Sequence, residues 1–231
     1  MLIAKFVLVA FIGYLLGSIP FGLIISKRKA RIDIRQYGSG KTGSTNVLRT
    51  LGRRAFMMVA ILDILKGALA VVFAGIIIGQ DYMLVGNSGL GLLFAQVIAA
   101  LAAVIGHIWP IFVKFKGGRG VATFIGGLIA LCPVAGLFGG EALIIGAGLS
   151  GFASLGSIFG VVGAYAILVP LTIMNGFPIE YLGYVLMGTL LIIFVHRGNI
   201  KRLMSGRERS LSQKAEQPGS NQSTQANTGG S

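Results

Sequence analysis

The chain has 231 residues, of which 54% are hydrophobic and only 12% are charged. This composition excludes an ordinary soluble domain and predicts a polytopic helical membrane protein, because several apolar stretches reach the length that crosses a bilayer. The formal net charge of +13 is better explained by basic residues that flank membrane spans than by nucleic-acid binding, so no nucleic-acid partner is expected.

The first apolar stretch, residues 3–26, is long enough to form one span. It carries a single early charge, Lys5, and lacks a clear small-residue cleavage site, and the segment that follows it is strongly basic. These features favour a retained signal anchor over a cleaved signal peptide, with the N-terminus outside.

A basic connector, residues 27–54, contains nine Lys and Arg residues and the first of three polar clusters, Gly38-Ser-Gly-Lys-Thr-Gly-Ser-Thr-Asn-Val-Leu-Arg49. Its glycine spacing matches a dinucleotide fingerprint and its Gly40-Lys41-Thr42 resembles the end of a Walker A loop, but the flanking pattern that either motif needs is missing. Glycine-rich backbone beside cations still suits a phosphate or carboxylate ligand. The alternative is a solvated loop that only orients the protein. The residues predicted to bind phosphate in this cluster are Gly38, Gly40, Gly43, Thr45 and Asn46.

Residues 55–113 accommodate two spans, with a polar and glycine-rich break near residues 80–91. The first of these two spans holds two charges, Asp63 and Lys66. Charges inside a membrane are costly and are usually paired or functional. The pair therefore either forms a purely structural ion pair or lines a site near the cytoplasmic end. His107, near the end of the following span, is expected to be buried and structural.

The second polar cluster, Lys114-Phe-Lys-Gly-Gly-Arg-Gly120, is more compact. Its two central glycines form a flexible cradle with a cation on either side, and a helix that begins near Gly120 would direct its N-terminal dipole at the same ligand. The alternative is a tight turn between spans. The residues predicted to bind phosphate here are Lys116, Gly117, Gly118, Arg119 and Gly120.

Residues 121–195 are apolar, with breaks at 133–141, 150–157 and 175–180, and have room for four spans. The fold class is therefore all-α, with about seven transmembrane helices, the N-terminus outside and the C-terminus cytoplasmic. In this topology 18 of the 20 Lys and Arg residues are cytoplasmic. Residues 1–204 are expected to form one membrane domain, and residues 205–231 a cytoplasmic, largely disordered tail.

The third polar cluster, His196-Arg-Gly-Asn-Ile-Lys-Arg202, places His196 and Asn199 on one face of a continuing helix. Both side chains are good partners for hydroxyl and phosphate groups, although an interfacial position without a catalytic role is the alternative. The seven acidic residues are spread too thinly to predict a metal site.

The three clusters, in this order, resemble those of the bacterial membrane acyl-phosphate:glycerol-3-phosphate acyltransferase family. The resemblance rests on residues 38–49, 116–123 and 196–202, together with Gly17-Ser-Ile-Pro-Phe-Gly22 and Asp63-x-x-Lys-Gly67. It covers essentially the whole chain except the tail. The chain departs from the family pattern at Lys41, Ser44 and Arg119, where the family has Asn, Ala and Lys. The added charge of Lys41 leaves the role of that position open.

The resemblance implies transfer of a fatty acyl group from a long-chain acyl phosphate to the 1-hydroxyl of glycerol 3-phosphate, in a membrane whose lipids surround the protein. It implies no coenzyme A thioester, metal or other cofactor, and it puts the active site on the cytoplasmic side of the cell inner membrane. Carried over to this chain, the catalytic residues are Ser39, Arg49, His196 and Asn199. A covalent acyl-Ser39 intermediate is an alternative to direct transfer. A transporter of phosphorylated molecules is a second function to consider, but no matching polar cluster exists for the outer side.

Overall fold

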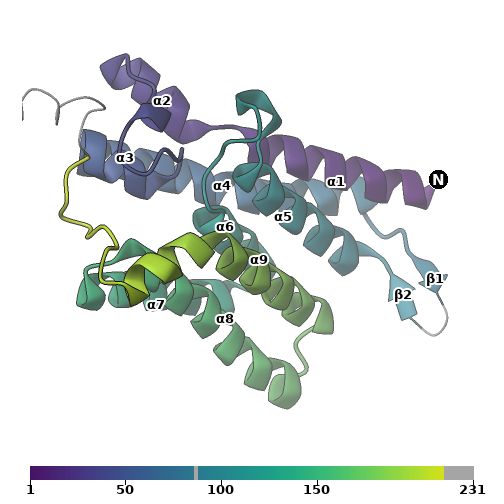
Figure 1. Ribbon diagram of the computed structural model, residues 1–231. Coiled ribbons are helices and arrows are strands. Elements are labelled where there is room, and N and C mark those ends of the chain that lie inside the picture. The colour runs from purple at the N-terminus through teal and green to yellow at the C-terminus, as the bar shows by residue number, and fades with distance from the viewer. Residues whose placement is uncertain (86–87, 216–231) are drawn as a thin grey trace, which may run out of the picture.

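The computed structural model describes residues 1–85 and 88–215, which form a helical bundle with one short hairpin (Figure 1). The long helices are α1 (Leu2–Ser18), α4 (Arg53–Ile78), α5 (Leu92–Ile108), α7 (Pro133–Ser150), α8 (Ala153–Asn175) and α9 (Ile179–Met204). Shorter elements are α2 (Phe21–Ala30), η1 (Ile34–Gln36), α3 (Ser44–Leu51), η2 (Ile111–Val113) and α6 (Val121–Leu131). Six helical segments in the described part of the chain are long and apolar enough to cross a membrane. The predicted all-helical, polytopic fold is confirmed.

The short helix α6 leaves the predicted total of seven spans unconfirmed. Its 11 residues reach only about 16 Å at the usual rise per residue, against a hydrocarbon core of about 30 Å. The helix ends at Cys132 because Pro133 begins α7, and proline is well accommodated in the first turn of a helix. Four helices do occupy the segment after residue 120, as predicted, but one of them is half the expected length.

The first apolar stretch forms one candidate span, Leu2–Ala30, as predicted, but the helix within it is broken. The helix α1 ends at Ser18, and α2 starts at Phe21 after Ile19 and Pro20. Proline has no N–H to donate and it disfavours helical backbone in the residue before it. The break frees the carbonyl of Ile19, which accepts a hydrogen bond of 3.0 Å from Lys66 Nζ on α4.

The two ends of the bundle differ (Figure 1). One end carries α2, α3 and the chain that follows α9, and the other carries the N-terminus and the hairpin of β1 (Met83–Val85) and β2 (Ser88–Leu90). The antiparallel register pairs Met83 with Leu90. Lys5 and Asp81 form an ion pair of 2.6 Å at this second end.

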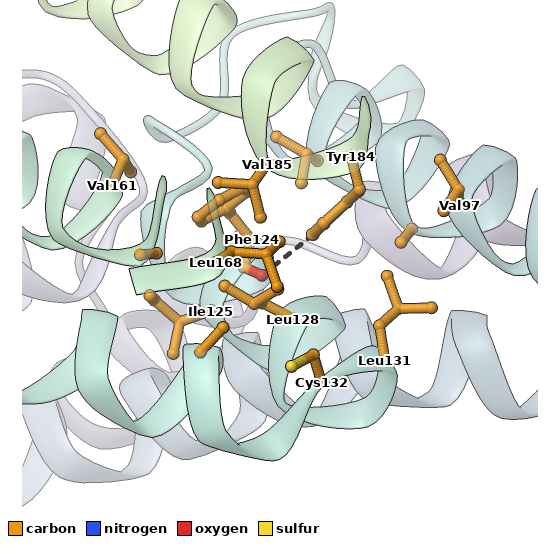
Figure 2. Packing of buried hydrophobic residues seen from close by; sticks show 14 of the residues in the cluster. Val97, Phe124, Ile125, Leu128, Leu131, Cys132, Val161, Leu168, Tyr184 and Val185 are labelled. Atoms are coloured by element: carbon orange, nitrogen blue, oxygen red, sulfur yellow. Dashed lines mark hydrogen bonds between the residues drawn. The ribbon is translucent and has the colours of Figure 1, made fainter. Parts of the chain in front are cut away.

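A hydrophobic core lies between α5, α6, α8 and α9 (Figure 2). The rings of Phe124 and Tyr184 stack with their centroids 5.1 Å apart, and the hydroxyl of Tyr184 donates to the carbonyl of Phe124 at 2.9 Å. This bond satisfies a polar group that would be costly to leave unpaired among apolar side chains. The core therefore fixes α6 against α9.

The helices α4 and α6 approach closely through reciprocal glycines. A Cβ on Gly126 would overlap the backbone of Ile64, and a Cβ on Gly67 would overlap the carbonyl of Thr123. Small residues at such positions let helix backbones come together inside a membrane. Gly156 and Gly160 of α8 pack closely in the same way, against Leu143 and Ala147 of α7.

Candidate active site

The structure brings the three polar clusters together around two neighbouring cavities at the end of the bundle that carries α2 and α3. The larger cavity is about 640 Å³ and the smaller about 70 Å³. Ser39, Lys41 and Arg119 line both cavities and so mark the boundary between them. The larger cavity adds Arg49, Asn199 and an apolar wall; the smaller adds His196, Asp63 and His107. Among the predicted phosphate ligands, the larger cavity is lined by Gly38, and the smaller by Gly43, Thr45, Asn46, Gly118 and Gly120.

The first loop is organised by Asn46, which lies at the start of α3 and is almost fully buried. Its Nδ2 is within 3.0–3.1 Å of the carbonyls of Ile34, Tyr37 and Lys41, and its Oδ1 accepts from the N–H of Ser39 at 3.0 Å. The amide group is thus fully used inside the protein. In this structure the side chain of Asn46 positions Ser39, and a contact of Asn46 with phosphate stays a prediction.

The glycine-rich second loop differs from the predicted cradle. The N–H groups of Gly117 and Gly118 donate to the carbonyls of Ile108 and His107, at 3.2 and 3.1 Å, so they are not available to a ligand. Lys116 is exposed and lines neither cavity. Of the cations predicted in this loop, only Arg119 faces both cavities. Gly40 likewise lines neither of the two.

Three helix N-termini converge on the smaller cavity. Its wall includes Ser44 and Thr45 of α3, Val121 and Ala122 of α6, and Ala153 of α8. The first N–H groups of a helix have no partner within it and carry partial positive charge. The predicted start of a helix near Gly120 is confirmed, since Gly120 precedes α6 with a positive φ of 82°. Converging helix N-termini of this kind favour an anionic ligand.

The imidazole of His196 is completely buried and faces the smaller cavity. Its Nδ1 is 2.8 Å from the carbonyl of Ile192. A carbonyl oxygen only accepts, so Nδ1 carries the proton and Nε2 has a free lone pair. No described residue donates to Nε2, which makes this atom available to a hydroxyl group of a ligand.

A buried polar network lies beneath the smaller cavity. Asp63 and Lys66 form an ion pair of 2.8 Å, and the Nδ1 of His107 lies 3.5 Å from Asp63 Oδ1. The hydroxyl of Thr123, at the start of α6, is 3.1 Å from the same Nδ1. Asp63 and Lys66 thus do more than pair with each other, because the network joins α4, α5 and α6.

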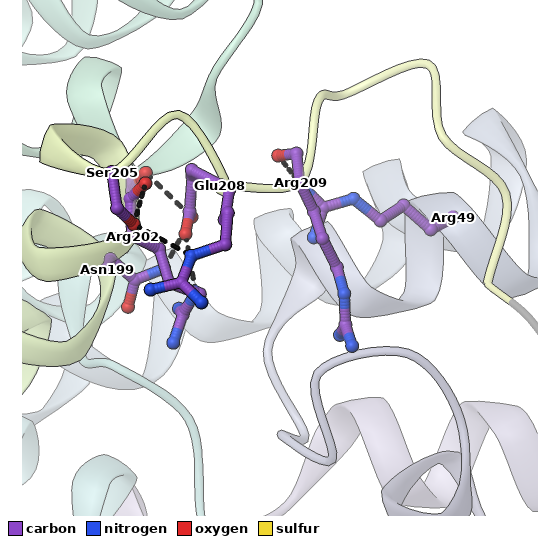
Figure 3. Close-up of polar contacts among 8 residues, drawn as sticks. Arg49, Asn199, Arg202, Ser205, Glu208 and Arg209 are labelled. Carbon is purple, nitrogen blue, oxygen red and sulfur yellow. Dashed lines mark hydrogen bonds and ion pairs between the residues drawn. The ribbon is translucent and has the colours of Figure 1, made fainter.

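The chain after α9 folds over the site (Figure 3). The carboxylate of Glu208 accepts hydrogen bonds from Asn199 at 2.6 Å, from Ser154 at 2.9 Å and from Arg202 at 2.8 Å. Burial opposes ionisation of Glu208, but these hydrogen bonds outweigh it and hold the pKa of the carboxyl below its usual value. The site therefore extends past the expected domain boundary at residue 204. The tail predicted to be largely disordered, residues 205–231, includes residues 216–231, which lie outside the described residues.

Arg49 also contacts this segment. Its Nε and Nη2 donate to the carbonyls of Ser210 and Arg209 at 3.1 and 2.8 Å (Figure 3). Burial lowers the pKa of the Arg49 guanidinium, and it lowers the pKa of Arg119 to about 10. Both guanidinium groups remain protonated at neutral pH, so the cavities keep their positive charge.

Sequence reasoning missed Glu208 and Ser154 as site residues. A signal for Glu208 was present, because it is one of only seven acidic residues and it stands between Arg207 and Arg209. No comparable signal marks Ser154, whose position depends on the turn between α7 and α8. Within the described residues no three His, Cys, Asp or Glu side chains gather in a way that could hold a metal ion.

Comparisons with known proteins agree on one family. Residues 7–206 match the model of the family described as glycerol-3-phosphate acyltransferase. The chain is 66% identical to glycerol-3-phosphate acyltransferase 3 of Dehalococcoides mccartyi strain CBDB1, over 93% of this chain and 100% of the relative. It is 38% identical to the glycerol-3-phosphate acyltransferase of Clostridioides difficile, over 93% and 99% of the two chains.

Two solved structures are also similar. One is the glycerol 3-phosphate form of PlsY, an integral membrane glycerol 3-phosphate acyltransferase, with a TM-score of 0.75 and 36% identity. The match covers 89% of this chain and 94% of the other. The lysophosphatidic acid form of the same protein has a TM-score of 0.74 and 35% identity, with the same coverage.

Proposed function

The chain belongs to the glycerol-3-phosphate acyltransferase family of integral membrane enzymes, and we propose that its acyl donor is a long-chain acyl phosphate. The acyl group passes to the 1-hydroxyl of sn-glycerol 3-phosphate, and the products are lysophosphatidic acid and inorganic phosphate. The observation that carries the proposal is the pair of adjoining cationic cavities, one small and one with an apolar wall, which share Ser39, Lys41 and Arg119. Two phosphorylated substrates of different character need two such sites that meet.

The smaller cavity takes the phosphate of glycerol 3-phosphate. Its volume of about 70 Å³ suits a single anionic group, and the converging N-termini of α3, α6 and α8 supply N–H donors. Arg119 adds a charged donor that can hold a phosphate oxygen bidentately. A glycerol phosphate form of a similar solved protein supports this choice of ligand.

The larger cavity takes the head of the acyl phosphate. Ile108, Trp109, Phe115, Phe194 and Val195 form its apolar wall, next to helix surfaces that face lipid. Ser39 and Arg49 lie in the same cavity, where a hydroxyl and a guanidinium can bind the acyl phosphate group. The acyl chain then lies along the apolar helices, and the reacting carbonyl meets glycerol where the cavities join.

The chemistry needs positioning and charge stabilisation rather than a metal. The glycerol hydroxyl oxygen attacks the acyl carbon, the bond from that carbon to the phosphate oxygen breaks, and the departing phosphate takes the hydroxyl proton. His196 Nε2 accepts a hydrogen bond from the attacking hydroxyl and, with Asn199, orients it. Holding two substrates in register can supply a large part of the rate gain, and Arg49 and Arg119 offset the charge on the departing phosphate.

The orientation in the membrane follows from charge. The end of the bundle with both cavities carries α2, α3 and the segment after α9, where the basic residues of the chain gather. Cytoplasmic segments of membrane proteins collect Lys and Arg. The active site therefore faces the cytoplasm, where glycerol 3-phosphate is available from water and the acyl phosphate from the bilayer.

The test uses purified protein in detergent or lipid, with palmitoyl phosphate and glycerol 3-phosphate and without metal or coenzyme A. Stoichiometric formation of inorganic phosphate and lysophosphatidic acid is expected. Ser39→Ala and Arg49→Ala should each abolish turnover, whereas Arg53→Ala, a neighbouring exposed arginine, should keep the wild-type rate. A wild-type rate in Ser39→Ala or Arg49→Ala would refute the role of the replaced residue. Turnover with an acyl thioester but not with palmitoyl phosphate would refute acyl phosphate as the donor.

Direct transfer differs from a covalent mechanism in what accumulates. Incubation of the protein with radiolabelled palmitoyl phosphate, without glycerol 3-phosphate, should leave no label on the denatured chain. Label that is retained by the wild type and lost in Ser39→Ala would establish an acyl-Ser39 intermediate and overturn direct transfer.

A further inference from the structure

We propose that His107, a buried histidine of α5, is a positioning residue for the phosphate of glycerol 3-phosphate. It acts by fixing the loop that carries Arg119 and the N-terminus of α6. The proposal rests on the assignment of the smaller cavity to that phosphate. It differs from a purely structural role because its effect falls mainly on the substrate in the smaller cavity, where His107, Gly118 and the start of α6 lie.

The ring of His107 is held from one side by charge and hydrogen bonding. Asp63 Oδ1 lies 3.5 Å from Nδ1, and the hydroxyl oxygen of Thr123 lies 3.1 Å from it. A carboxylate beside Nδ1 favours a proton on that nitrogen, so Nδ1–H points toward Thr123 and Asp63. All three side chains are at most 6% exposed, which strengthens these interactions and makes them costly to break.

The other edge of the ring lies against the loop. A Cβ on Gly118 would overlap Nε2, Cδ2 and Cε1 of His107, so only glycine fits while the imidazole is in place. The backbone of the same histidine contributes as well, because its carbonyl accepts from the N–H of Gly118. The residue thus holds Gly118 through both its backbone and its ring.

The anchor of the network is rigid. Lys66 pairs with Asp63 at 2.8 Å and donates to the carbonyl of Ile19, at the break between α1 and α2. The carboxylate that faces His107 is therefore held by a cation that also contacts the break between α1 and α2. Loss of either partner of a buried ion pair leaves an uncompensated charge and is strongly destabilising, so Lys66 keeps the carboxylate of Asp63 in place.

The consequence for the ligand follows from chain connectivity. Arg119 follows Gly118 directly, and α6 begins two residues after Arg119. The positions of the Arg119 guanidinium and of the first N–H groups of α6 therefore depend on where the loop lies. Thr123 ties that first turn of α6 to the same imidazole. A misplacement of about 1 Å at a binding group can cost about 100-fold in rate. Loss of the imidazole frees the loop to move on this scale.

The experiment measures the affinity for glycerol 3-phosphate by calorimetry and the KM for palmitoyl phosphate separately. His107→Ala is expected to weaken binding of glycerol 3-phosphate about 10- to 100-fold. The change in KM for the acyl phosphate should be clearly smaller, because the larger cavity shares Arg119 but is not lined by His107, Gly118 or the start of α6. His107→Asn keeps an N–H donor near the position of Nδ1 and should restore most of the affinity.

A double-mutant cycle tests the contact itself. Gly118→Ala alone should weaken binding because the new methyl group meets the ring. In the double variant with His107→Ala the methyl group has room, so the combined loss should be smaller than the product of the two single losses. Tyr184→Phe, which loses a buried hydrogen bond to α6 away from the loop, is the control and should bind glycerol 3-phosphate normally.

Three results would overturn the proposal. The first is that His107→Ala binds glycerol 3-phosphate with wild-type affinity. The second is that the affinity losses of the two single variants multiply in the double variant. The third is that His107→Ala affects both substrates equally and that His107→Asn does not restore the affinity for glycerol 3-phosphate. If His107→Ala fails to fold, His107→Asn and Gly118→Ala are compared, and normal affinity in Gly118→Ala would overturn it. Wild-type protein that binds glycerol 3-phosphate but does not turn over palmitoyl phosphate would refute the donor while leaving the positioning role measurable.

Discussion

Replacement of Gly126 by alanine tests how closely α4 and α6 must pack. The new Cβ would lie inside the contact distance of three backbone atoms of Ile64, and a backbone cannot rotate away as a side chain can. Since nonbonded carbon and oxygen atoms keep about 3.5 Å apart, the two helices would have to separate by about 1.5 Å. The reciprocal contact of Gly67 with Thr123 would open at the same time.

The expected cost follows from this separation. Overpacking of a close interface costs typically about 1–3 kcal/mol, and a gap of about 1 Å already removes up to half of the dispersion energy of each contact. We therefore expect Gly126→Ala to lower the free energy of unfolding by about 1–3 kcal/mol. The matched control is Gly148→Ala in α7, where a Cβ meets nothing within 4 Å.

The assay is equilibrium unfolding of both purified variants in mixed micelles, followed by circular dichroism. Gly148→Ala should unfold like the wild type or at slightly higher denaturant, because alanine loses less entropy in a helix than glycine does. If Gly126→Ala and Gly148→Ala unfold at the same denaturant concentration, the close approach of α4 and α6 is not under the steric constraint described above.

Two further predictions concern charge at the site. Because the pKa of Glu208 is lowered in the folded protein, its carboxylate stabilises the fold at neutral pH, and this contribution is lost as the pH falls below about 4.3. Glu208→Gln should therefore lower the Tm at pH 7 but lower it less at pH 3. A Tm difference between variant and wild type that does not change with pH would argue against this role of Glu208. Burial and the nearby Arg119 lower the pKa of Lys41, whose ammonium group stays charged beside both cavities. Lys41→Asn should raise the KM for glycerol 3-phosphate at low salt and weaken the dependence of that KM on salt, whereas Lys29→Asn at an exposed position should do neither. An unaltered salt dependence of the KM in Lys41→Asn would contradict this role.

Much of the helical layout could be predicted from the sequence because hydropathy and helix-breaking residues report on it directly. The breaks at Pro133, Gly151 and Gly176 fall where polar, glycine or proline residues interrupt apolar runs. The break at Pro20 was missed because the apolar run continues on both sides of it. The length of α6 could not be predicted either, since it depends on how deep the preceding loop lies.

The position of the three polar clusters on one side of the membrane could be predicted from the even number of spans between neighbouring clusters and from the distribution of Lys and Arg. Which partner each polar group binds could not be predicted. Asn46 has the same donors and acceptors whether it binds a ligand or its own loop, and only the tertiary structure shows that the loop occupies all of them. The amides of Gly117 and Gly118 are similarly taken by the end of α5. The glycines matter for close packing, which a sequence pattern does not distinguish from anion binding.

The helices α7 and α8 are joined by only Gly151 and Phe152, and α7 carries Glu141 at an exposed position in its middle. An acidic residue at the centre of a span adds about 3 kcal/mol to the cost of insertion by the translocon. The helix α7 is therefore poorly suited to enter the bilayer alone during synthesis. The helix α8 has no charged residue and packs on α7 through Gly156 and Gly160. We expect α7 to be retained in the translocon until α8 has left the ribosome. The two helices would then partition into lipid together, as a preassembled hairpin.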